Sequence, residues 1–528
     1  MHKSPSSDRK VDMSRNLVIF CDGTWNSPEE EEFGKPTETN VHKLFTFCQD
    51  EAQSNGRQVT WYQPGVGSDG SWYRRAFEGA TGTGTGLNIR RGYSAIAARY
   101  HDGDRIILVG FSRGAFAARS IAGMIEKIGL IKDPSRPAVE AAYELYRRVR
   151  LYDDPVLATH RTSTKVHTRA RVHAIGVWET VGALGLSMWG WSFNFRGLWR
   201  NSFHRLSPNR ITDHVFQALA IDEKRTSFVP VVWIDSPEEA DSAGTVGLER
   251  LPHPKVEEAW FRGVHSDIGG GYADARLSDV TLGWMAERLS TVGLLLRPNM
   301  PYIAPSPLGR IHNSARGPLW TNVATWPRWT PMRTLAEMGN PSLRSYAHES
   351  VAERERLGET EGLAEQKRYW LRVGERRRVV VRARYQWEYT GIVLEPGVRY
   401  ALRADGSWQD WKDSPVGAEG QSPGDQSLLK RLARPLKRVR EGNWLELIAL
   451  PCHDFGWHWR ELGVGRALYY LLIDDPAEFK SQYLRVGRGC EIVGPAGSEA
   501  MLWCFGNDAR KFYGNNTGSV LLEVQRLE

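Results

Sequence analysis

Cysteine is scarce in this chain, which excludes two classes of protein. The 528 residues contain five cysteines, at positions 21, 48, 452, 490 and 504. An odd, widely spaced set fits neither a disulfide framework nor a cysteine-based zinc site. We therefore expect free thiols in a reducing compartment.

Long hydrophobic runs are also missing. No apolar stretch approaches the ~20 residues that a membrane-spanning helix needs. Residues 1–15 are polar and lack the hydrophobic core of a secretory signal. We expect these 15 residues to be a disordered leader. We also expect the protein to be cytoplasmic in the producing cell, without a Sec signal.

The net charge of +7 is small for 528 residues and does not indicate a nucleic-acid partner. It permits attraction to the anionic surface of a phospholipid membrane. Tryptophan is abundant, with 21 residues against 17 phenylalanines. Its amphipathic ring suits interfaces and sugar-stacking surfaces, although a tryptophan-rich core is the alternative.

The stretch around Ser112 carries the first catalytic signal. An apolar, β-branched run, Ile106–Val109, predicts a buried parallel strand, and helix-forming residues follow Gly114. Between them lies the Gly-x-Ser-x-Gly pattern of a nucleophile elbow, a tight strand-to-helix turn that exposes a serine. Because strand and helix flank the pattern, it predicts a nucleophile at Ser112 rather than a structural turn.

Two later strand ends supply the partners of a nucleophilic serine. The predicted strand Val172–Trp178 ends in Glu179, and the strand Glu258–Val264 ends in His265. The order serine, acid, histidine is that of α/β-hydrolase triads. We therefore predict Glu179 as the acid and His265 as the base.

Alternatives remain at this stage. Asp267 is a rival for the acid, or a group that fixes the tautomer of the histidine. His348 is a weaker candidate for the base. The backbone N–H groups of Gly23, Thr24 and Arg113 are predicted to stabilise the oxyanion, although Gly23–Thr24 also fits an ordinary βα turn.

An aromatic, glycine-containing and basic stretch lies between the predicted acid and base. An exposed aromatic patch with arginines fits a lipid-facing lid, and an irregular buried crossover is the alternative. The lipid-facing candidates are Trp189, Trp191, Phe193, Phe195 and Trp199. The next stretch, His214–Glu223, is expected to form an amphipathic helix.

Four motifs together resemble the bacterial and fungal α/β-hydrolase family that includes the first group of type VI secretion lipase effectors. They are Cys21-Asp22-Gly23-Thr24, Gly110-Phe111-Ser112-Arg113-Gly114-Ala115-Phe116, Val177-Trp178-Glu179-Thr180-Val181-Gly182 and Gly263-Val264-His265-Ser266-Asp267-Ile268-Gly269-Gly270-Gly271-Tyr272. The resemblance implies a lipolytic Ser-acid-His enzyme with phospholipase A activity. Ser112 and His265 match its motifs, whereas Glu179 stands where the family usually has aspartate.

Composition predicts further divisions of the chain. Residues 16–300 are expected to form an α/β-hydrolase catalytic domain, with a mostly parallel sheet and helices on both faces. Residues 301–375 are expected to be a linker and helical brace. Short strand patterns with Gly and Asn turns over residues 376–528 predict an all-β sandwich.

The last turn of this sandwich is rich in oxygen ligands. On residue types alone it fits either a hard-cation site or an Asn-Gly hairpin turn. The stretch resembles the calcium-dependent galactose-binding lectin of the PA-I type, and Asp508, Asn515 and Asn516 match its ligands. The resemblance implies a Ca²⁺ site that includes the Phe512 carbonyl, and Asp410 lies in a loop that resembles the second ligand loop.

The combined expectation is a serine ester hydrolase that acts on phospholipids without a cofactor for its chemistry. The resemblances imply a membrane surface and a galactose-like glycan as binding partners. They further imply an antibacterial effector with secretion machinery and an immunity protein as partners, delivered by a type VI system into a target-cell periplasm. Two alternatives stay open: a catalytically silent hydrolase fold that binds carbohydrate, and a soluble hydrolase of small esters or thioesters.

Overall fold

The computed structural model describes a large part of the chain. The described residues are 14–23, 31–32, 35–65, 83–148, 156, 159–160, 163–167, 169–181, 186–188, 191–193, 211–223, 225, 228, 230, 233, 255–301, 303–312, 314, 344–358, 368–411, 413–452, 481–497, 499–509 and 513–528. None of the helices within these ranges is long and apolar enough to span a bilayer.

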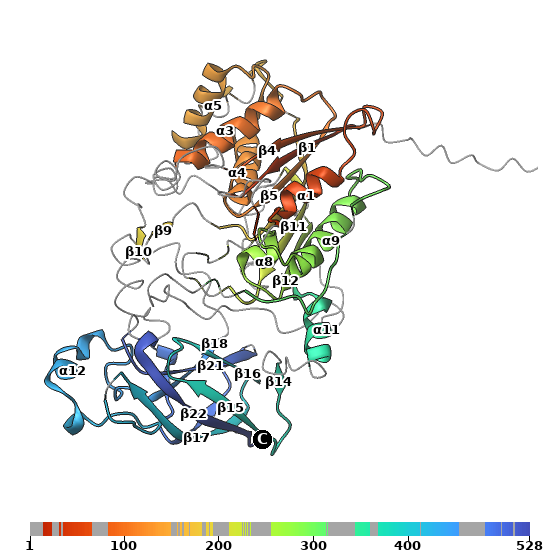
Figure 1. Cartoon of the computed structure of the whole chain (residues 1–528). Helices are drawn as coiled ribbons and strands as arrows, with labels where there is room; N and C mark the ends of the chain where they lie inside the picture. Colours follow the sequence, from red (N-terminus) through yellow and green to blue (C-terminus); the bar gives the residue numbers. More distant parts are fainter. Residues whose placement is uncertain are drawn as a thin grey trace, which may run out of the picture.

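The first part of the chain folds around a seven-stranded parallel sheet (Figure 1). In spatial order its strands are β4 (Gln58–Gln63), β1 (Asn16–Cys21), β5 (Arg105–Phe111), β8 (Val172–Trp178), β11 (Thr212–Ala220), β12 (Lys255–Phe261) and β13 (Arg344–Ala347). The chain runs from β1 outward to β4 and then returns past β1 to β5. The direction of strand addition therefore reverses between β1 and β5, which is where open α/β sheets bind their ligands.

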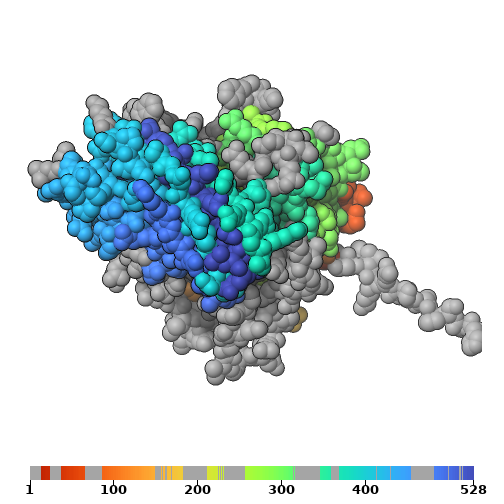
Figure 2. Space-filling view, turned by 90° about the horizontal axis from the view of Figure 1, so that it is seen from below, coloured from red at the N-terminus to blue at the C-terminus, as the bar shows by residue number. Residues whose placement is uncertain are grey.

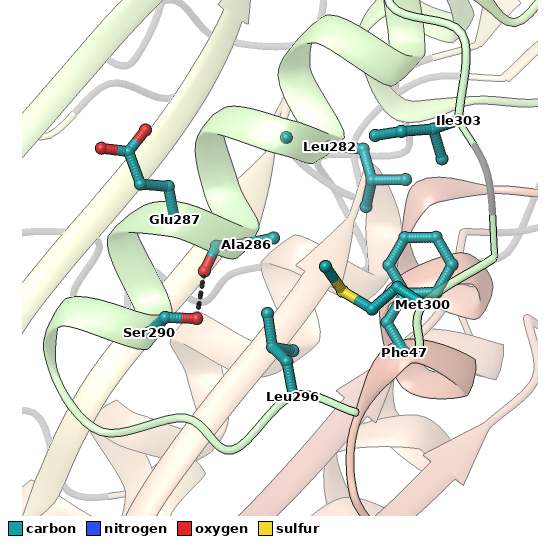
Figure 3. Close-up of a pocket in the computed structure, with 9 residues that line it drawn as sticks. Phe47, Leu282, Ala286, Glu287, Ser290, Leu296, Met300 and Ile303 are labelled. Atoms are coloured by element: carbon teal, nitrogen blue, oxygen red, sulfur yellow. Dashed lines mark hydrogen bonds between the residues drawn. The ribbon is translucent and has the colours of Figure 1, made fainter. Parts of the chain in front are cut away.

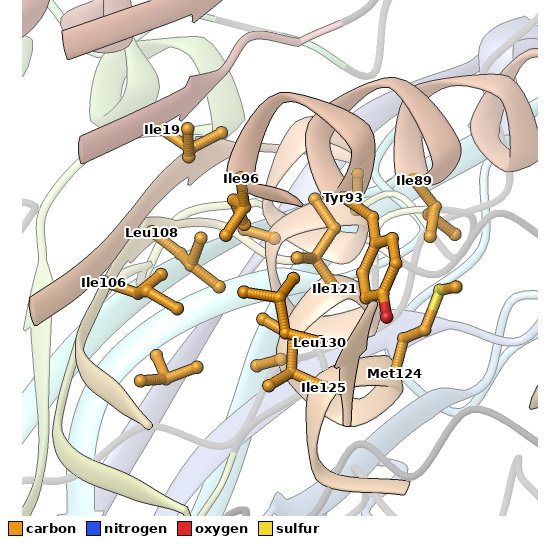
Figure 4. Close-up of a cluster of buried hydrophobic side chains, with 14 of the residues drawn as sticks. Ile19, Ile89, Tyr93, Ile96, Ile106, Leu108, Ile121, Met124, Ile125 and Leu130 are labelled. Atoms are coloured by element: carbon orange, nitrogen blue, oxygen red, sulfur yellow. The ribbon is translucent and has the colours of Figure 1, made fainter. Parts of the chain in front are cut away.

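Helices cover both faces of this sheet, so its strands are buried on both sides. Leu17 and Ile19 of β1 enter one core, and Val18 and Phe20 enter the other. The first core is covered by α3 (Thr83–Ala97), α4 (Arg113–Ile128) and α5 (Arg136–Arg148), and the second by α1 (Asn40–Phe47) and α9 (Arg276–Thr291). In Figure 4, strand residues of the first core face isoleucines and a tyrosine of α3 and α4. The predicted α/β fold with helices on both faces is confirmed.

Two expectations about this sheet are wrong. The stretch expected as a helix, His214–Glu223, instead forms most of β11, which pairs in parallel with β8 and β12. A strand covered on both faces shows no polar and apolar alternation, so its sequence is easily mistaken for a helix. The sheet also continues beyond residue 300, because β13 lies in the expected linker and pairs with β12.

The C-terminal part contains two β-sheets, as predicted. One has the order β14 (Tyr369–Trp370), β16 (Glu388–Leu394), β21 (Ala500–Gly506), β18 (Leu447–Cys452) and β19 (Leu484–Arg485). The other has the order β15 (Arg376–Arg382), β22 (Asn516–Arg526), β17 (Arg399–Asp410) and β20 (Gly489–Val493). Side chains from both sheets share one core, so the two sheets form a sandwich. Figure 2 shows residues of this part, in cyan to blue, with green residues of the first part beside them.

Short elements complete the described structure. Helix α11 (Glu349–Gly358) follows β13, and its Glu355 accepts a hydrogen bond of 2.7 Å from Arg368 Nε, just before the sandwich begins. Two-residue and three-residue ribbons are formed by β2 (Glu31–Glu32) with β3 (Lys35–Pro36), β6 (Leu130–Ile131) with β7 (Val166–His167), and β9 (Leu186–Met188) with β10 (Trp191–Phe193).

Backbone packs closely against backbone at the turn from β5 to α4. A Cβ atom at Gly114 would lie 2.1 Å from the carbonyl oxygen of Cys21, at the end of β1. A Cβ atom at Gly110 would lie 2.6 Å from the carbonyl oxygen of Gly114. Both glycines of the elbow pattern are therefore required by close approach of backbone to backbone.

We expect Gly114→Ala to destabilise the protein by about 1–3 kcal/mol, because rigid backbone must move to admit the methyl group. Gly283→Ala is the matched control, since Gly283 lies inside α9 and a Cβ there meets nothing within 4 Å. That substitution should stabilise the helix by up to about 1 kcal/mol. Urea unfolding of both variants measures the difference. Equal free energies of unfolding would contradict the described packing of the elbow.

Candidate active site

Ser112 occupies a strained backbone position at the end of β5. Its φ of 57° and ψ of −119° lie outside the usual regions for a residue with a side chain. The turn is held by the Ser112 N–H, which donates a 3.1 Å hydrogen bond to the carbonyl of Trp178 at the end of β8. The residue is the N-cap of α4, so the N–H groups of the first helical turn lie beside it.

His265 begins the short helix α8 (His265–Gly269), shortly after β12 ends. Its ring lies 4.7 Å, between centroids, from the ring of Phe111, the residue before Ser112. The ring of Phe228 contacts it edge-on at 4.8 Å. Gly269 makes this arrangement feasible, because a Cβ there would lie 2.0 Å from the Phe111 ring. The histidine is therefore packed against the strand that carries the serine.

Glu179 approaches the same imidazole from the end of β8. Its Oε2 lies 3.3 Å from His265 Nδ1, and its Oε1 accepts a 2.7 Å hydrogen bond from the N–H of Ala220. The carboxyl group is fully buried, and Glu179 itself has a φ of 41°. Of the two predicted acids, Glu179 is the one that the structure places against His265.

Burial lowers the pKa of His265 below its usual value, and the hydrogen bond that the imidazole donates to Glu179 opposes that shift. The imidazole is therefore neutral at pH 7. With Nδ1–H directed to Glu179, the Nε2 lone pair is free to accept a proton, which is the state that a general base requires.

Asp267 engages a second imidazole. One of its carboxylate oxygens lies 2.6 Å from His312 Nδ1. The other accepts hydrogen bonds from the N–H of Val264 at 3.0 Å and of His312 at 3.1 Å. The structure thus separates the two candidate acids into two carboxylate–imidazole pairs, and Asp267 holds the beginning of α8.

Glu223 is a site residue that the sequence interpretation did not identify. It accepts a 3.2 Å hydrogen bond from the backbone N–H of His265. Arg225 binds its carboxylate with two hydrogen bonds of 2.9 and 2.7 Å. A carboxylate just after β11 is a strand-end signal, but it was hidden because β11 was interpreted as a helix.

The predicted oxyanion donors have different surroundings. The N–H of Gly23 donates a 2.6 Å hydrogen bond to Asp22, whose carboxylate also accepts from the hydroxyl groups of Thr39 and Tyr62. Arg113 is the first residue of α4, so its N–H has no carbonyl partner one turn earlier. Thr24 lies outside the described residues.

The other predicted site residues lie elsewhere or outside the described structure. His348 stacks on Phe261 at 4.4 Å and contacts the Ser350 hydroxyl at 2.9 Å, and burial lowers its pKa to about 4. Trp189, Phe195 and Trp199 are not among the described residues. Trp191 and Phe193 belong to β10, but their side chains are outside the described structure.

Four of the five predicted calcium ligands gather where β22 begins, at Asn516. Asp508 is 2% exposed, and burial together with the charge of Asp410 raises its pKa to about 7. Asn516 Nδ2 donates to Asp508 Oδ2 at 2.8 Å, and Asn515 Nδ2 donates to Asp410 Oδ1 at 3.1 Å. The buried Oδ1 atoms of both asparagines have no partner within the described residues.

A lysine also enters this cluster. Lys430 of the short helix α12 (Leu428–Leu432) contacts Asp410 Oδ2 at 2.8 Å and contacts Asp413 as well. Phe512 lies outside the described residues. Across the part of the chain that the structure describes, no group of three or more His, Cys, Asp and Glu residues has a metal-binding arrangement. A cation site at this position would therefore need the asparagine oxygens as ligands in addition to the carboxylates.

A separate apolar pocket of about 250 Å³ lies between α1, α9 and the segment after α9 (Figure 3). Phe47, Leu282, Leu296, Met300 and Ile303 line it, and the Ser290 hydroxyl at its edge donates a 2.7 Å hydrogen bond to the Ala286 carbonyl. None of the predicted catalytic residues lines this pocket.

The uncharacterized protein YEL023C of Saccharomyces cerevisiae is 27% identical over 245 residues, which cover 42% of this chain and 33% of that protein. The chain thus spans about a third of the length of this curated relative.

Two solved structures are similar in part. One is the Tle1 effector bound to the VgrG spike from the type 6 secretion system, which is 21% identical with a TM-score of 0.29. The matched region covers 52% of this chain and 56% of the effector chain. The other is the EclA N-terminal domain, described as a PllA-like lectin, which is 19% identical with a TM-score of 0.18. The matched region covers 28% of this chain and 94% of the lectin chain.

A family model described as the catalytic domain of the Tle1-like phospholipase effectors of the type VI secretion system matches residues 15–288. This match includes β1, the elbow, Glu179 and the α8 loop, and extends over just over half of the chain. The chain therefore belongs to the family of Tle1-like type VI secretion phospholipase effectors.

Proposed function

We propose that the protein is a serine ester hydrolase that acts on phospholipids as a phospholipase A-type lipase. One observation carries the proposal: a buried imidazole, contacted by Glu179 at 3.3 Å, packs against the residue that precedes the strained Ser112. Family membership supports the same activity.

Each residue has a defined task in the proposed reaction. Ser112 Oγ attacks the ester carbonyl carbon while His265 accepts its proton, and Glu179 stabilises the imidazolium that forms. The Arg113 N–H at the start of α4 donates to the oxyanion of the tetrahedral intermediate. Collapse releases the alcohol, which takes the proton from His265, and water then cleaves the acyl-serine by the same steps. This chemistry needs no cofactor.

The Arg113 side chain favours an anionic ester over a neutral one. Burial alone lowers its pKa to about 10, so that it stays protonated at neutral pH. Among the described residues, no carboxylate forms an ion pair with it. A partly desolvated guanidinium without a counter-charge is costly in the free protein and suits a ligand with negative charge. The phosphodiester of a phospholipid lies close to its ester bonds and meets that requirement.

Family membership supports a proposal for delivery and partners. We propose an antibacterial effector that type VI machinery carries into a target-cell periplasm, where it meets phospholipid membrane. The similar Tle1 effector is bound to a VgrG spike, which supports a spike protein as the secretion partner. An immunity protein in the producing cell is part of the same proposal.

The C-terminal sandwich is proposed to bind Ca²⁺ and a galactose-like glycan. Asp508 and the unpartnered Oδ1 atoms of Asn515 and Asn516 are hard oxygen ligands of the kind that Ca²⁺ prefers. Lys430 competes with Ca²⁺, because its ammonium group already neutralises Asp410. Calcium would therefore have to displace this lysine.

Substitution of the two candidate acids tests the triad. We expect Glu179→Gln to lower kcat for phosphatidylglycerol hydrolysis by about 10³-fold or more, because the imidazolium loses its counter-charge. It should also move the acidic limb of the pH profile to lower pH, since Glu179 raises the pKa of His265. Asp267→Asn should lower kcat by a far smaller factor than Glu179→Gln. Ser112→Ala should abolish hydrolysis; retained turnover, or a greater loss in the Asp267 variant, would contradict the assignment.

Substitution of Arg113 tests the substrate class. Arg113→Gln keeps the backbone N–H and removes the charge. We expect kcat/KM for phosphatidylglycerol to fall by about 10–100-fold, the loss typical of a charge-assisted hydrogen bond. Diacylglycerol with the same acyl chains should be hydrolysed as before, and Arg113→Lys should retain part of the preference. An equal loss on both lipids would show that the guanidinium does not select the phosphodiester.

Removal of Lys430 tests the calcium site. We expect Lys430→Met to bind Ca²⁺ at least about tenfold more tightly than the unsubstituted protein, because a competing unit charge is removed. Arg431→Met is the control, since it removes the same charge from the neighbouring position of α12. Calorimetric titration with CaCl₂ gives both affinities. Equal affinities, or no binding by either protein, would exclude the proposed site.

A further inference from the structure

The segment that follows α9 packs against residues 264–276, which we call the catalytic loop because they include His265. We call residues 303–312 and 314 the crossing segment. Its backbone is attached to the loop after α8, since the N–H of Ser306 donates to the Arg276 carbonyl at 3.1 Å and the N–H of Arg310 contacts Asp274 at 3.4 Å. Gly309 packs against Arg276 and Leu277, where a Cβ atom would approach to 2.9 Å. The segment therefore lies directly on the loop that carries His265.

Its far end contacts two carboxylates, Asp267 of the catalytic loop and Glu223 after β11. His312 binds Asp267 through Nδ1 at 2.6 Å and through its backbone N–H at 3.1 Å. The Ser314 hydroxyl lies 3.1 Å from both carboxylate oxygens of Glu223. These carboxylates fix the backbone at positions 264 and 265, since Glu223 accepts from the His265 N–H and Asp267 from the Val264 N–H.

The crossing segment is itself held in place from two directions. The ring of Tyr272 stacks on the ring of His312 at 3.8 Å, with 21° between their planes. Arg354 of α11 donates to the carbonyl of Gly309 at 2.8 Å and also contacts the carbonyl of Pro307. His312 thus lies on a braced segment, and its imidazole has a fixed position relative to Asp267.

We propose that His312 is a positioning residue for catalysis, acting through Asp267 on the backbone that orients His265. This inference rests on the proposed hydrolase function, in which His265 is the base. The Asp267 side chain is fully buried, so its negative charge depends on the few donors that reach it. With the imidazole removed, Asp267 holds the start of α8 less firmly, and the His265 ring loses its alignment with Ser112.

The experiment compares the reactivity of Ser112 in matched variants of the full chain. The second-order rate constant for inactivation by a fluorophosphonate reports how well His265 activates the serine. We expect His312→Ala to lower this rate by about 10–100-fold, the cost of a misplacement near 1 Å. The loss should appear in kcat and leave KM unchanged. His312→Asn should restore most of the rate, because its amide N–H replaces Nδ1–H.

The control variant removes another histidine–aspartate pair, which lies away from Ser112 and His265. His167 contacts the exposed Asp102 at 2.9 Å, so His167→Ala should react like the unsubstituted protein. If His312→Ala does not fold, Asp267→Asn tests the same contact and should show the same loss. Unchanged inactivation in either variant, or no rescue by asparagine, would overturn the positioning role. An unsubstituted protein that does not react would instead overturn the hydrolase proposal.

Discussion

The contact of α4 with the end of β1 is the constraint on which the site depends. Only glycine at position 114 permits it, because any Cβ would lie 2.1 Å from the Cys21 carbonyl oxygen. This approach forces the chain to turn sharply after β5 and places Ser112 at a φ of 57°. The turn lies where strand addition changes direction, so groups from the ends of β8 and β12 can converge on one serine.

Three buried carboxylates surround the catalytic loop, and each is held by hydrogen-bond donors. Glu179 faces the His265 ring, whereas Glu223 and Asp267 bind backbone N–H groups at positions 265 and 264. Burying a carboxylate costs several kcal/mol unless donors satisfy it. The site therefore has little freedom to rearrange, and catalysis benefits because a base must keep its direction between turnovers.

The strand-end motifs were predictable because each combines a buried strand with a reactive residue at its carboxyl end. Ser112, Glu179 and His265 were predicted in this way, and strand patterns predicted the parallel sheet of the first part and the sandwich of the second. β11 was missed because a doubly covered strand lacks alternation, and Glu223 was missed with it. The partner of Asp267 lies 45 residues away at His312, and Lys430 reaches Asp410 from α12. Local sequence patterns carry no signal for such contacts.

The central claim is that Ser112 is activated by His265 at the reversal point of the sheet. The most direct measurement is mass spectrometry of the intact protein after fluorophosphonate treatment, followed by mapping of the modified peptide. The account requires a single adduct on Ser112 that is lost in His265→Ala. An adduct on another residue, or equal labelling of Ser112 in His265→Ala, would contradict this activation.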